Sequence, residues 1–435
     1  MHEIITIKTD LPKRKEERYI PFSPDFIGLL KRNLERHKFS DNEVVQTIYF
    51  SNDDHSLPFL LTLKTRRYLP AKHKSEPRTF RGKWFFDIKE RRDDLKYKTR
   101  IRVTLKEALD IANKKYGKKI MTLRPFFMLK YKRQHYVYND GKGVYARFSI
   151  DKNTRYFYFD NKQKNPVLIG TEPYPRLEIK TKGNSKKLIG LIEKLKSDLK
   201  VIPVISKKGQ AYNLLCKYMY KKDSIFFLKE LKECEIESKL VSKTESVFPL
   251  VFNALRSGKY AYKIPSHFKH VFESSSINQY YKNSKESFKV LLRPDYMSVV
   301  RKGKVKVCSN SENLKCILKR SETKQRFENI QPEILKKGRL QGELYRYRKA
   351  FWVENPETRR IYHISFDICQ TSERKLYEME VEYTGRFASS VQPNVNEQEI
   401  VDDIARITKI LLSLSGDLRE STLTKREWLL KGSNR

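Results

Sequence analysis

The chain has 435 residues, enough for two ordinary domains that each bury a core. Its hydrophobic content of 39%, with 25 Tyr and 24 Phe, excludes a disordered chain, because it supplies enough apolar surface for folding. The 91 Lys and Arg against 52 Asp and Glu give a formal net charge of +39, which favours anionic partners: nucleic acid, nucleotides, polyphosphate or a membrane surface.

The cellular compartment is predicted from cysteines and hydropathy. The five cysteines form no CxxC pair, and an odd number of thiols is typical of a reducing compartment. Residues 1–12 lack the apolar core of a signal peptide, and no run of about 18 apolar residues predicts a membrane span. We therefore expect a cytoplasmic protein.

The first half of the chain reads as strands followed by a helix. Strand patterns cover 44–68, 84–103, 124–138, 144–159 and 174–181. Leucines at helical spacing then predict a helix over 184–200, and a shorter helix is expected over 106–115.

The same order recurs in the second half. Strand patterns cover 235–240, 289–308, 314–320, 341–353, 360–368 and 376–383, and a helix is predicted over 397–414. This recurrence predicts two diverged copies of one antiparallel barrel, joined near residues 221–222. The alternative is that any two basic, β-rich domains would show such echoes.

Charged residues, nearly all basic, alternate with apolar ones along the strands of the first half. Examples are Lys64-Thr65-Arg66, Asp87-Ile88-Lys89, Tyr131-Lys132-Arg133 and Glu178-Ile179-Lys180. Residues two apart share one face of a strand, so a closed barrel would turn these cations toward a common interior. Buried cations without partners are costly, so the interior should hold a polyanion. Otherwise the charged face lies outside the barrel.

These motifs carry a resemblance. Residues 1–222 resemble the catalytic domain of polyphosphate polymerases of the vacuolar transporter chaperone (VTC) type, a branch of the triphosphate tunnel superfamily. The resemblance implies that the catalytic residues are Lys64, Arg66, Lys89, Arg133, Arg147 and Lys207, the last from a Ser206-Lys207 step. It implies that Arg18, Lys98, Arg100, Tyr131 and Lys180 bind the substrate and that Glu178 binds a metal ion.

Two acidic strands mark the second half. Glu235-Ile236-Glu237-Ser238-Lys239 and Glu378-Met379-Glu380-Val381-Glu382 resemble the CYTH branch of the same superfamily and the RNA triphosphatases. The resemblance implies that Glu235, Glu237, Glu380 and Glu382 bind Mn²⁺ or Mg²⁺, hard cations that prefer oxygen ligands. It implies that substrate is bound by Lys239, Arg301, Lys319, Arg346 and Arg348, with Asp367 nearby. Because Glu-x-Glu steps are frequent on exposed strands, a decayed or structural copy is the alternative.

The predicted fold is α+β, with two tandem antiparallel β-barrels and flanking helices, in domains 1–222 (VTC-like) and 223–435 (CYTH-like). The predicted function is metal-dependent phosphoryl transfer from a nucleoside triphosphate, with polyphosphate made in the first tunnel. The first alternative is a triphosphatase acting on RNA ends, inorganic triphosphate or polyphosphate. The second is a protein that binds polyanions or nucleic acid without catalysis. The sequence contains no GxxxxGK[ST], GxGxxG or HExxH motif and no zinc-ligand spacing.

Overall fold

The computed structural model describes most of the chain. Described are residues 15–21, 25–36, 43–51, 62–69, 84–92, 95–102, 106–107, 110, 124–139, 141, 143–160, 165–172, 174–183, 185–199, 201–222, 227–228, 231, 233–265, 271–284, 286–293, 296–327, 333, 338–371, 373–387 and 396–431. Between 51 and 105 this description covers the backbone of the strands alone. The chain divides into two compact units, Met1–Ile202 and Pro203–Arg435.

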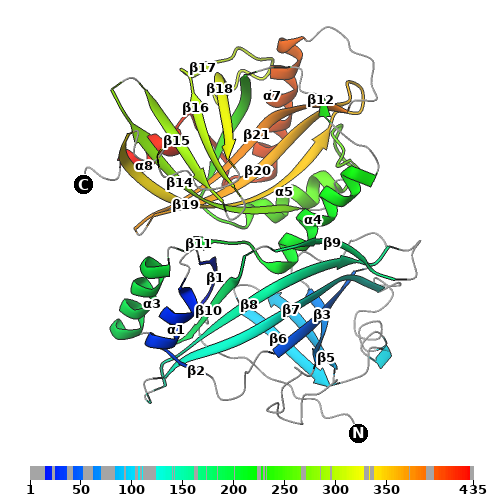
Figure 1. Cartoon of the computed structure of the whole chain (residues 1–435). Helices are drawn as coiled ribbons and strands as arrows, with labels where there is room; N and C mark the ends of the chain where they lie inside the picture. Colours follow the sequence, from blue (N-terminus) through cyan, green and yellow to red (C-terminus); the bar gives the residue numbers. More distant parts are fainter. Residues whose placement is uncertain are drawn as a thin grey trace. The chain divides into compact units, whose positions relative to one another are not determined.

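The first unit consists of one antiparallel sheet with helices (Figure 1). Its elements are β1 (Lys15–Ile20), α1 (Phe26–Asn33), β2 (Glu35–Arg36), β3 (Glu43–Ser51), β4 (Thr62–Leu69), β5 (Trp84–Arg92), β6 (Leu95–Arg102), β7 (Arg124–Asn139), β8 (Tyr145–Tyr158), β9 (Val167–Thr171), β10 (Arg176–Lys182), α3 (Lys186–Leu199) and β11 (Ile202–Pro203).

The second unit begins with a helix and contains the second sheet. Its elements are α4 (Lys207–Lys222), β12 (Phe227–Leu228), β13 (Cys234–Ser242), α5 (Val247–Arg256), β14 (Phe272–Lys282), β15 (Ser287–Leu292), β16 (Met297–Lys302), β17 (Lys306–Val307), β18 (Ile317–Phe327), β19 (Arg339–Glu354), β20 (Arg360–Gln370), β21 (Lys375–Phe387), α7 (Glu397–Leu414), β22 (Arg419–Glu420) and α8 (Lys425–Lys431).

The second sheet closes into an eight-stranded antiparallel barrel. The strands follow in the order β13-β21-β20-β19-β14-β15-β16-β18, and β18 pairs with β13 to complete the ring. The predicted α+β fold with an antiparallel barrel is therefore confirmed.

The first sheet has the same strand order without the closing pair. Its strands follow in the order β1-β10-β8-β7-β3-β4-β5-β6. Among the strands that the structure describes, β6 pairs with β5 alone, so the closure expected of the first barrel is not observed. The shared strand order agrees with the predicted internal repeat.

Helix α4 groups with the second unit. Its Asn213 side chain donates to the backbone oxygen of Glu273 on β14 at 2.6 Å. The boundary between the compact units therefore falls in the sequence before α4, whereas the sequence-based prediction assigned residues 203–222 to the first domain. The functional domains 1–222 and 223–435 stay a prediction.

Helices cover the outer, apolar faces of the strands. On the second barrel, Phe248 of α5 lies 5.9 Å from the ring of Phe351 on β19, and Ile404 of α7 is fully buried in the same core. In the first unit, Leu188 of α3 is buried with Phe148 of β8. Because the helices cover the apolar outer faces, the charged faces of the second barrel's strands turn inward.

The longest predicted helix is confirmed. The predicted range 397–414 matches α7, whose Asn396 side chain caps the first backbone amides, and the prediction 184–200 corresponds to α3. The sequence reading missed α5 and β14. Apart from 106–107 and 110, the helix expected over 106–115 lies outside the described residues. No helix in the described part of the chain is both long and apolar enough to cross a bilayer.

A buried carboxylate fixes α7 to the barrel. Asp403 of α7 accepts hydrogen bonds from the Tyr262 hydroxyl at 2.9 Å, the Tyr362 hydroxyl at 2.5 Å and the Asn355 amide at 3.0 Å. These donors lie on or beside the barrel wall, and Asp403 is 2% exposed. The helix is therefore held by polar contacts as well as by its apolar face.

Replacing this carboxylate should destabilise the second unit. We expect Asp403→Ala to lower the free energy of unfolding by about 3 kcal/mol, because buried hydroxyl and amide groups lose their acceptor. Urea denaturation followed by circular dichroism measures the change. Lys409→Ala, also on α7 but with a 68% exposed side chain paired to Glu312, is the control and should cost below about 1 kcal/mol. Equal losses in both variants would contradict this role for Asp403.

Candidate functional site

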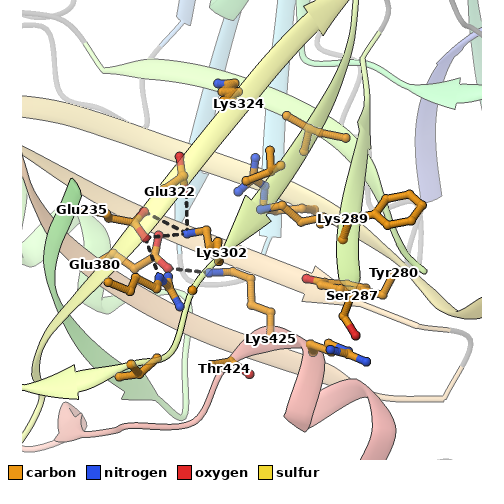
Figure 2. Close-up of a pocket in the computed structure, with 18 of the residues that line it drawn as sticks. Glu235, Tyr280, Ser287, Lys289, Lys302, Glu322, Lys324, Glu380, Thr424 and Lys425 are labelled. Carbon is orange, nitrogen blue, oxygen red and sulfur yellow. Dashed lines mark hydrogen bonds and ion pairs between the residues drawn. The ribbon is translucent and has the colours of Figure 1, made fainter. Parts of the chain in front are cut away.

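The second unit contains a strongly charged cavity of about 350 Å³ (Figure 2). Ten of its lining residues are cationic: Lys239, Lys289, Arg293, Lys302, Arg320, Lys324, Arg346, Arg348, Lys425 and Arg426. Four are acidic: Glu235, Glu322, Glu380 and Glu382. These residues come from the barrel strands and from the start of α8, so the inner face of the barrel forms the site.

Strand alternation places these charges inside. On β13, Glu235, Glu237 and Lys239 alternate with Ile236 and Leu240, which are buried in the core shared with α5 and α7. The inner side of the strand thus carries the Glu-x-Glu-x-Lys step that the sequence singled out.

One group of carboxylates joins β13 to β21. Glu237 lies directly opposite Glu382 in the strand register. Lys302 binds Glu235 at 2.7 Å, and Arg320 donates to both Glu235 and Glu237. Glu382 lies half-buried in the cavity wall, and this burial, together with the neighbouring Glu235 and Glu237 carboxylates, raises the pKa of Glu382 to about 8.

The residues of this group have the donor chemistry of a divalent metal site, and Lys302 and Arg320 already bind two of the three carboxylates. Like charges crowd Glu382, and a bound cation would relieve their repulsion. The oxygen donors are those that Mg²⁺ and Mn²⁺ prefer. Glu235, Glu237 and Glu382 are therefore candidate ligands by donor type, whereas among the described residues only Asp367, Glu378 and Glu380 bring three carboxylate oxygens within 4.8 Å of one another.

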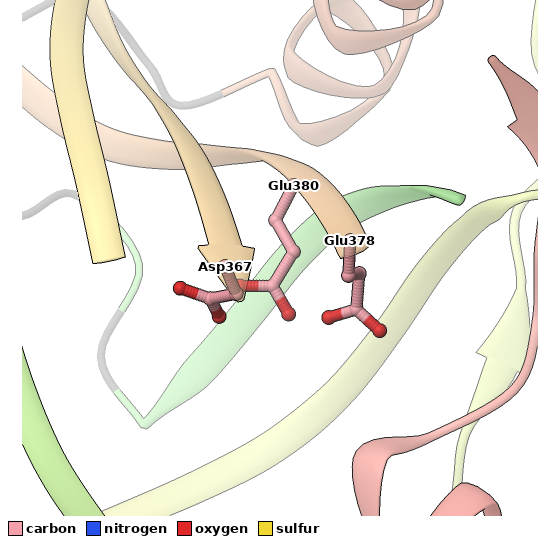
Figure 3. Close-up of side chains that lie close together, drawn as sticks. All are labelled: Asp367, Glu378 and Glu380. Carbon is pink, nitrogen blue, oxygen red and sulfur yellow. The ribbon is translucent and has the colours of Figure 1, made fainter. Parts of the chain in front are cut away.

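A second group of carboxylates already holds a cation of the protein. Asp367, Glu378 and Glu380 each place an oxygen within 4.8 Å of the others (Figure 3). The Lys425 ammonium lies 3.0 Å from Asp367 and 2.7 Å from Glu380, and it donates to Glu378. A metal ion could enter this group only by displacing Lys425. The four predicted metal ligands therefore do not form one group. Glu380 belongs to the group that Lys425 occupies, apart from Glu235, Glu237 and Glu382.

Two further cations fix the second group. Arg348 donates two hydrogen bonds to Asp367, at 2.6 and 2.7 Å, and Lys239 binds Glu380 at 2.9 Å. Although burial favours the protonated form, Lys239 and Lys425 lower the pKa of Glu380 well below its usual range. Burial raises the pKa of Glu378 to about 7, and the Glu380 carboxylate adds to this increase.

The remaining cavity wall carries surplus positive charge. Burial and the nearby Lys302 and Arg346 lower the pKa of Lys289 well below its usual range. The Nε atom of Arg346 is buried and has no hydrogen-bond partner within the described structure. Such groups favour an anionic ligand, because a buried donor without an acceptor is costly.

Two predicted substrate ligands face away from the cavity. Arg301 donates to Glu286 at 2.9 Å with 45% of its side chain exposed, and Lys319 binds Glu397 at 2.6 Å. Their sequence neighbours Lys302 and Arg320 line the cavity instead. Because side chains alternate along a strand, an error of one residue moves a side chain to the opposite face.

In the first unit, the described candidate residues lie close together. Arg133 donates to Asp151 at 2.5 and 2.8 Å, and its guanidinium lies 4.0 Å from Glu178 and 5.2 Å from the Tyr131 ring centre. Lys180 donates to Glu178. The Glu178 carboxylate is therefore already surrounded by cations.

The rest of the first-unit candidates are placed by register or by sequence. Opposite Glu178 on β1 lies Arg18, and opposite Lys180 on β8 lies Arg147. The registers assign Lys64, Arg66, Lys89, Lys98 and Arg100 to the sheet face that carries Arg133, and their side chains lie outside the described part. Lys207 begins α4, which belongs to the second unit.

The sequence reading missed eight of the fourteen charged residues that line the cavity. The missed residues are Lys289, Arg293, Lys302, Arg320, Glu322, Lys324, Lys425 and Arg426, with Glu378 behind the wall. A signal for Lys425 was present. Thr424-Lys425 begins the helix after α7, just as Ser206-Lys207 begins the helix after α3.

Comparisons with known proteins give no family assignment. No protein family and no curated protein matches the sequence. A solved structure of an adenylyl cyclase-like protein from Hippeastrum, described as having a dominant triphosphatase activity, is similar to this chain over 46% of this chain and 96% of its own length, at 14% identity and a TM-score of 0.30. An adenylate cyclase-like protein of Bacillus halodurans is similar over 45% of this chain and 95% of its own, at 13% identity and a TM-score of 0.28. The S. pombe RNA triphosphatase is similar over 48% of this chain and 91% of its own, at 13% identity and a TM-score of 0.24. We therefore infer function from the cavity itself.

Removing the ammonium from the second carboxylate group should destabilise the barrel. We expect Lys425→Met to lower the free energy of unfolding by about 3 kcal/mol or more, because buried carboxylates lose a partner. Mg²⁺ or Mn²⁺ should recover part of this loss, since three oxygens then converge without the Lys425 ammonium between them. Thermal denaturation with and without metal measures both effects. Lys431→Met, at the exposed end of α8, is the control; a metal response equal to that of the control would contradict the role of Lys425.

Proposed function

We propose that the second unit is a metal-dependent phosphohydrolase that cleaves a terminal phosphate from a triphosphate. The observation that carries this proposal is the excess of cations over carboxylates in a cavity of about 350 Å³. With the buried Glu237, Asp367 and Glu378 included, ten cations face seven carboxylates, an excess of three. A triphosphate that carries one divalent ion matches a site with this surplus.

Two sets of cations in the cavity would contact the triphosphate in different ways. Lys289, Lys324 and Arg346 would bind the non-bridging phosphate oxygens, whose negative charge would offset the burial and the neighbouring cations that lower the pKa of Lys289 and of Lys324. Arg348 and Lys239 are held in place by Asp367 and Glu380, so they meet the ligand without reorganising. Phosphoryl transfer depends mainly on such positioning and on neutralising charge on the phosphate.

Glu235, Glu237 and Glu382 would hold the metal ion. When bound, a divalent ion supplies charge neutralisation at the phosphates and lowers the pKa of a water molecule. Lys302 and Arg320 orient Glu235, and Arg320 also orients Glu237. The protein therefore presents a metal side and a phosphate side in one cavity.

The other predicted functions give different products. Polyphosphate synthesis by the first unit stays a prediction, and it would yield polymer from ATP. A non-catalytic binder of polyanions or nucleic acid would release no phosphate, and its affinity would fall steeply with salt. Inorganic triphosphate, ATP and an RNA with a 5′-triphosphate are the substrates to compare.

Loss of the metal-side carboxylates should abolish hydrolysis. We expect Glu235→Gln and Glu382→Gln to lower phosphate release by about 100-fold or more with Mg²⁺ or Mn²⁺, because each variant loses a charged metal ligand. Glu286→Gln, which removes a carboxylate from the outer face, is the matched control. Full metal-dependent release in Glu382→Gln would refute the assignment.

The same reactions report on the first unit. Polymer on a gel that is lost in Glu178→Gln and kept in Glu382→Gln would establish synthesis by the first unit. Phosphate without polymer, lost in Glu382→Gln, would support hydrolysis in the second barrel.

Neighbouring cations on β16 and β18 test the inward face directly. We expect Lys302→Ala and Arg320→Ala to lower kcat/KM by about 10-fold or more, because each loses a charge-assisted contact inside the cavity. Arg301→Ala and Lys319→Ala remove the same types of charge from the outer face and should change kcat/KM less than about 2-fold. Steady-state kinetics with inorganic triphosphate measures all four, and equal losses within each neighbouring pair would show that bulk charge alone matters.

A further inference from the structure

The two units can be compared position by position because their strand registers agree. Arg133 lies opposite Asp151 in the first unit, as Arg348 lies opposite Asp367 in the second. Glu178 lies opposite Ser149 on the next pair of strands, and Glu380 correspondingly lies opposite Ser365. The correspondence therefore spans three strands.

The central ion pair has the same geometry in both units. Arg133 donates from Nε and a terminal nitrogen to Asp151 at 2.5 and 2.8 Å. Arg348 donates through the same atoms to Asp367 at 2.6 and 2.7 Å. The first unit thus keeps the ion pair that positions an arginine in the second.

Two carboxylates of the second barrel are replaced by cations in the first unit. Lys180 stands where the second barrel has Glu382. Lys180 lies opposite Glu16 of β1, just as Glu382 lies opposite Glu237 of β13. Arg176 stands where the second barrel has Glu378, since Arg176 lies opposite Asp151 and Glu378 lies opposite Asp367. The replaced carboxylates include one that would hold the metal ion.

The charges explain the replacement of Glu382. A carboxylate with a bound divalent ion presents one net positive charge to a phosphate, and so does an ammonium group. We propose that the first unit binds a phosphate chain without a metal ion, with the Lys180 ammonium in the place of the carboxylate-bound metal. The choice of ligand rests on the function proposed for the second unit.

The surroundings of Lys180 support this role. Its side chain is 18% exposed, donates to Glu178 and lies 3.9 Å from Glu16, so its position is fixed. Arg18, bound to Glu16, lies opposite Glu178 on the adjacent strand. The same sheet face carries eight further basic positions on β4, β5 and β6 by register, against one acidic position, Asp87. This face therefore has surplus positive charge.

The decisive experiment measures triphosphate binding in EDTA. Isothermal titration calorimetry is performed on the full chain with Lys289→Ala and Arg346→Ala, which weakens the second cavity. We expect one equivalent of inorganic triphosphate to bind in EDTA, and Lys180→Gln in this background to weaken binding at least 10-fold. Lys180→Arg should retain it, and Lys186→Gln, an exposed lysine on α3, is the control. Lys180→Glu should make binding depend on Mg²⁺.

The outcomes separate this inference from the proposed hydrolysis. Absence of binding in EDTA, or binding unaffected by Lys180→Gln, would overturn the inference whatever the hydrolytic activity. Binding in EDTA that needs Lys180, in a protein that releases no phosphate, would support the inference and refute the proposed hydrolysis.

Discussion

The cost of burying charge governs the second unit. An eight-stranded barrel of this size ordinarily fills its interior with apolar side chains. Here the interior carries ten cations with seven carboxylates in or just behind its wall. Each buried charge needs a partner, and each apolar face turned outward needs a cover. Helices α5 and α7 supply that cover, so their positions follow from the charged interior.

The ion pairs also prepare the site for a ligand. Arg348 is bound by Asp367 and Glu380 before any phosphate arrives, and its pKa is raised well above its usual range by Asp367, against the effect of burial. Its side chain therefore loses little conformational entropy on binding. Lys289 and Arg346 differ, because burial and neighbouring cations lower the pKa of Lys289 and the buried Nε atom of Arg346 has no hydrogen-bond partner among the described residues, so an anionic ligand would stabilise both side chains.

Sequence reasoning reached the features that depend on local pattern. Helix α7 was predicted at its observed bounds because its apolar residues recur at helical spacing, and the acidic strands were found because Glu alternates with apolar residues. Arg301 and Lys319 were misplaced because each has a basic neighbour, and pattern alone does not say which of the two faces inward. Strand β14 was missed because its consecutive serines give a weak strand signal.

The division of the carboxylates depended on distant contacts. Lys425 fills the group of Asp367, Glu378 and Glu380 from a helix 45 residues beyond Glu380, a distance at which no local pattern operates. In the first unit, the exchange of Glu382 for Lys180 was visible in the sequence, but its meaning required the register that aligns the strands.

The position of Lys425 in the chain has a consequence for biosynthesis. All eight strands of the second barrel have been made once the ribosome passes residue 387, yet three interior carboxylates still lack their ammonium group. The nascent barrel must keep these acids hydrated or protonated until α8 is translated. Docking of α8 then completes the interior charge balance, so a chain interrupted before residue 425 would present a barrel with incompletely paired interior carboxylates to the quality-control machinery of the cell.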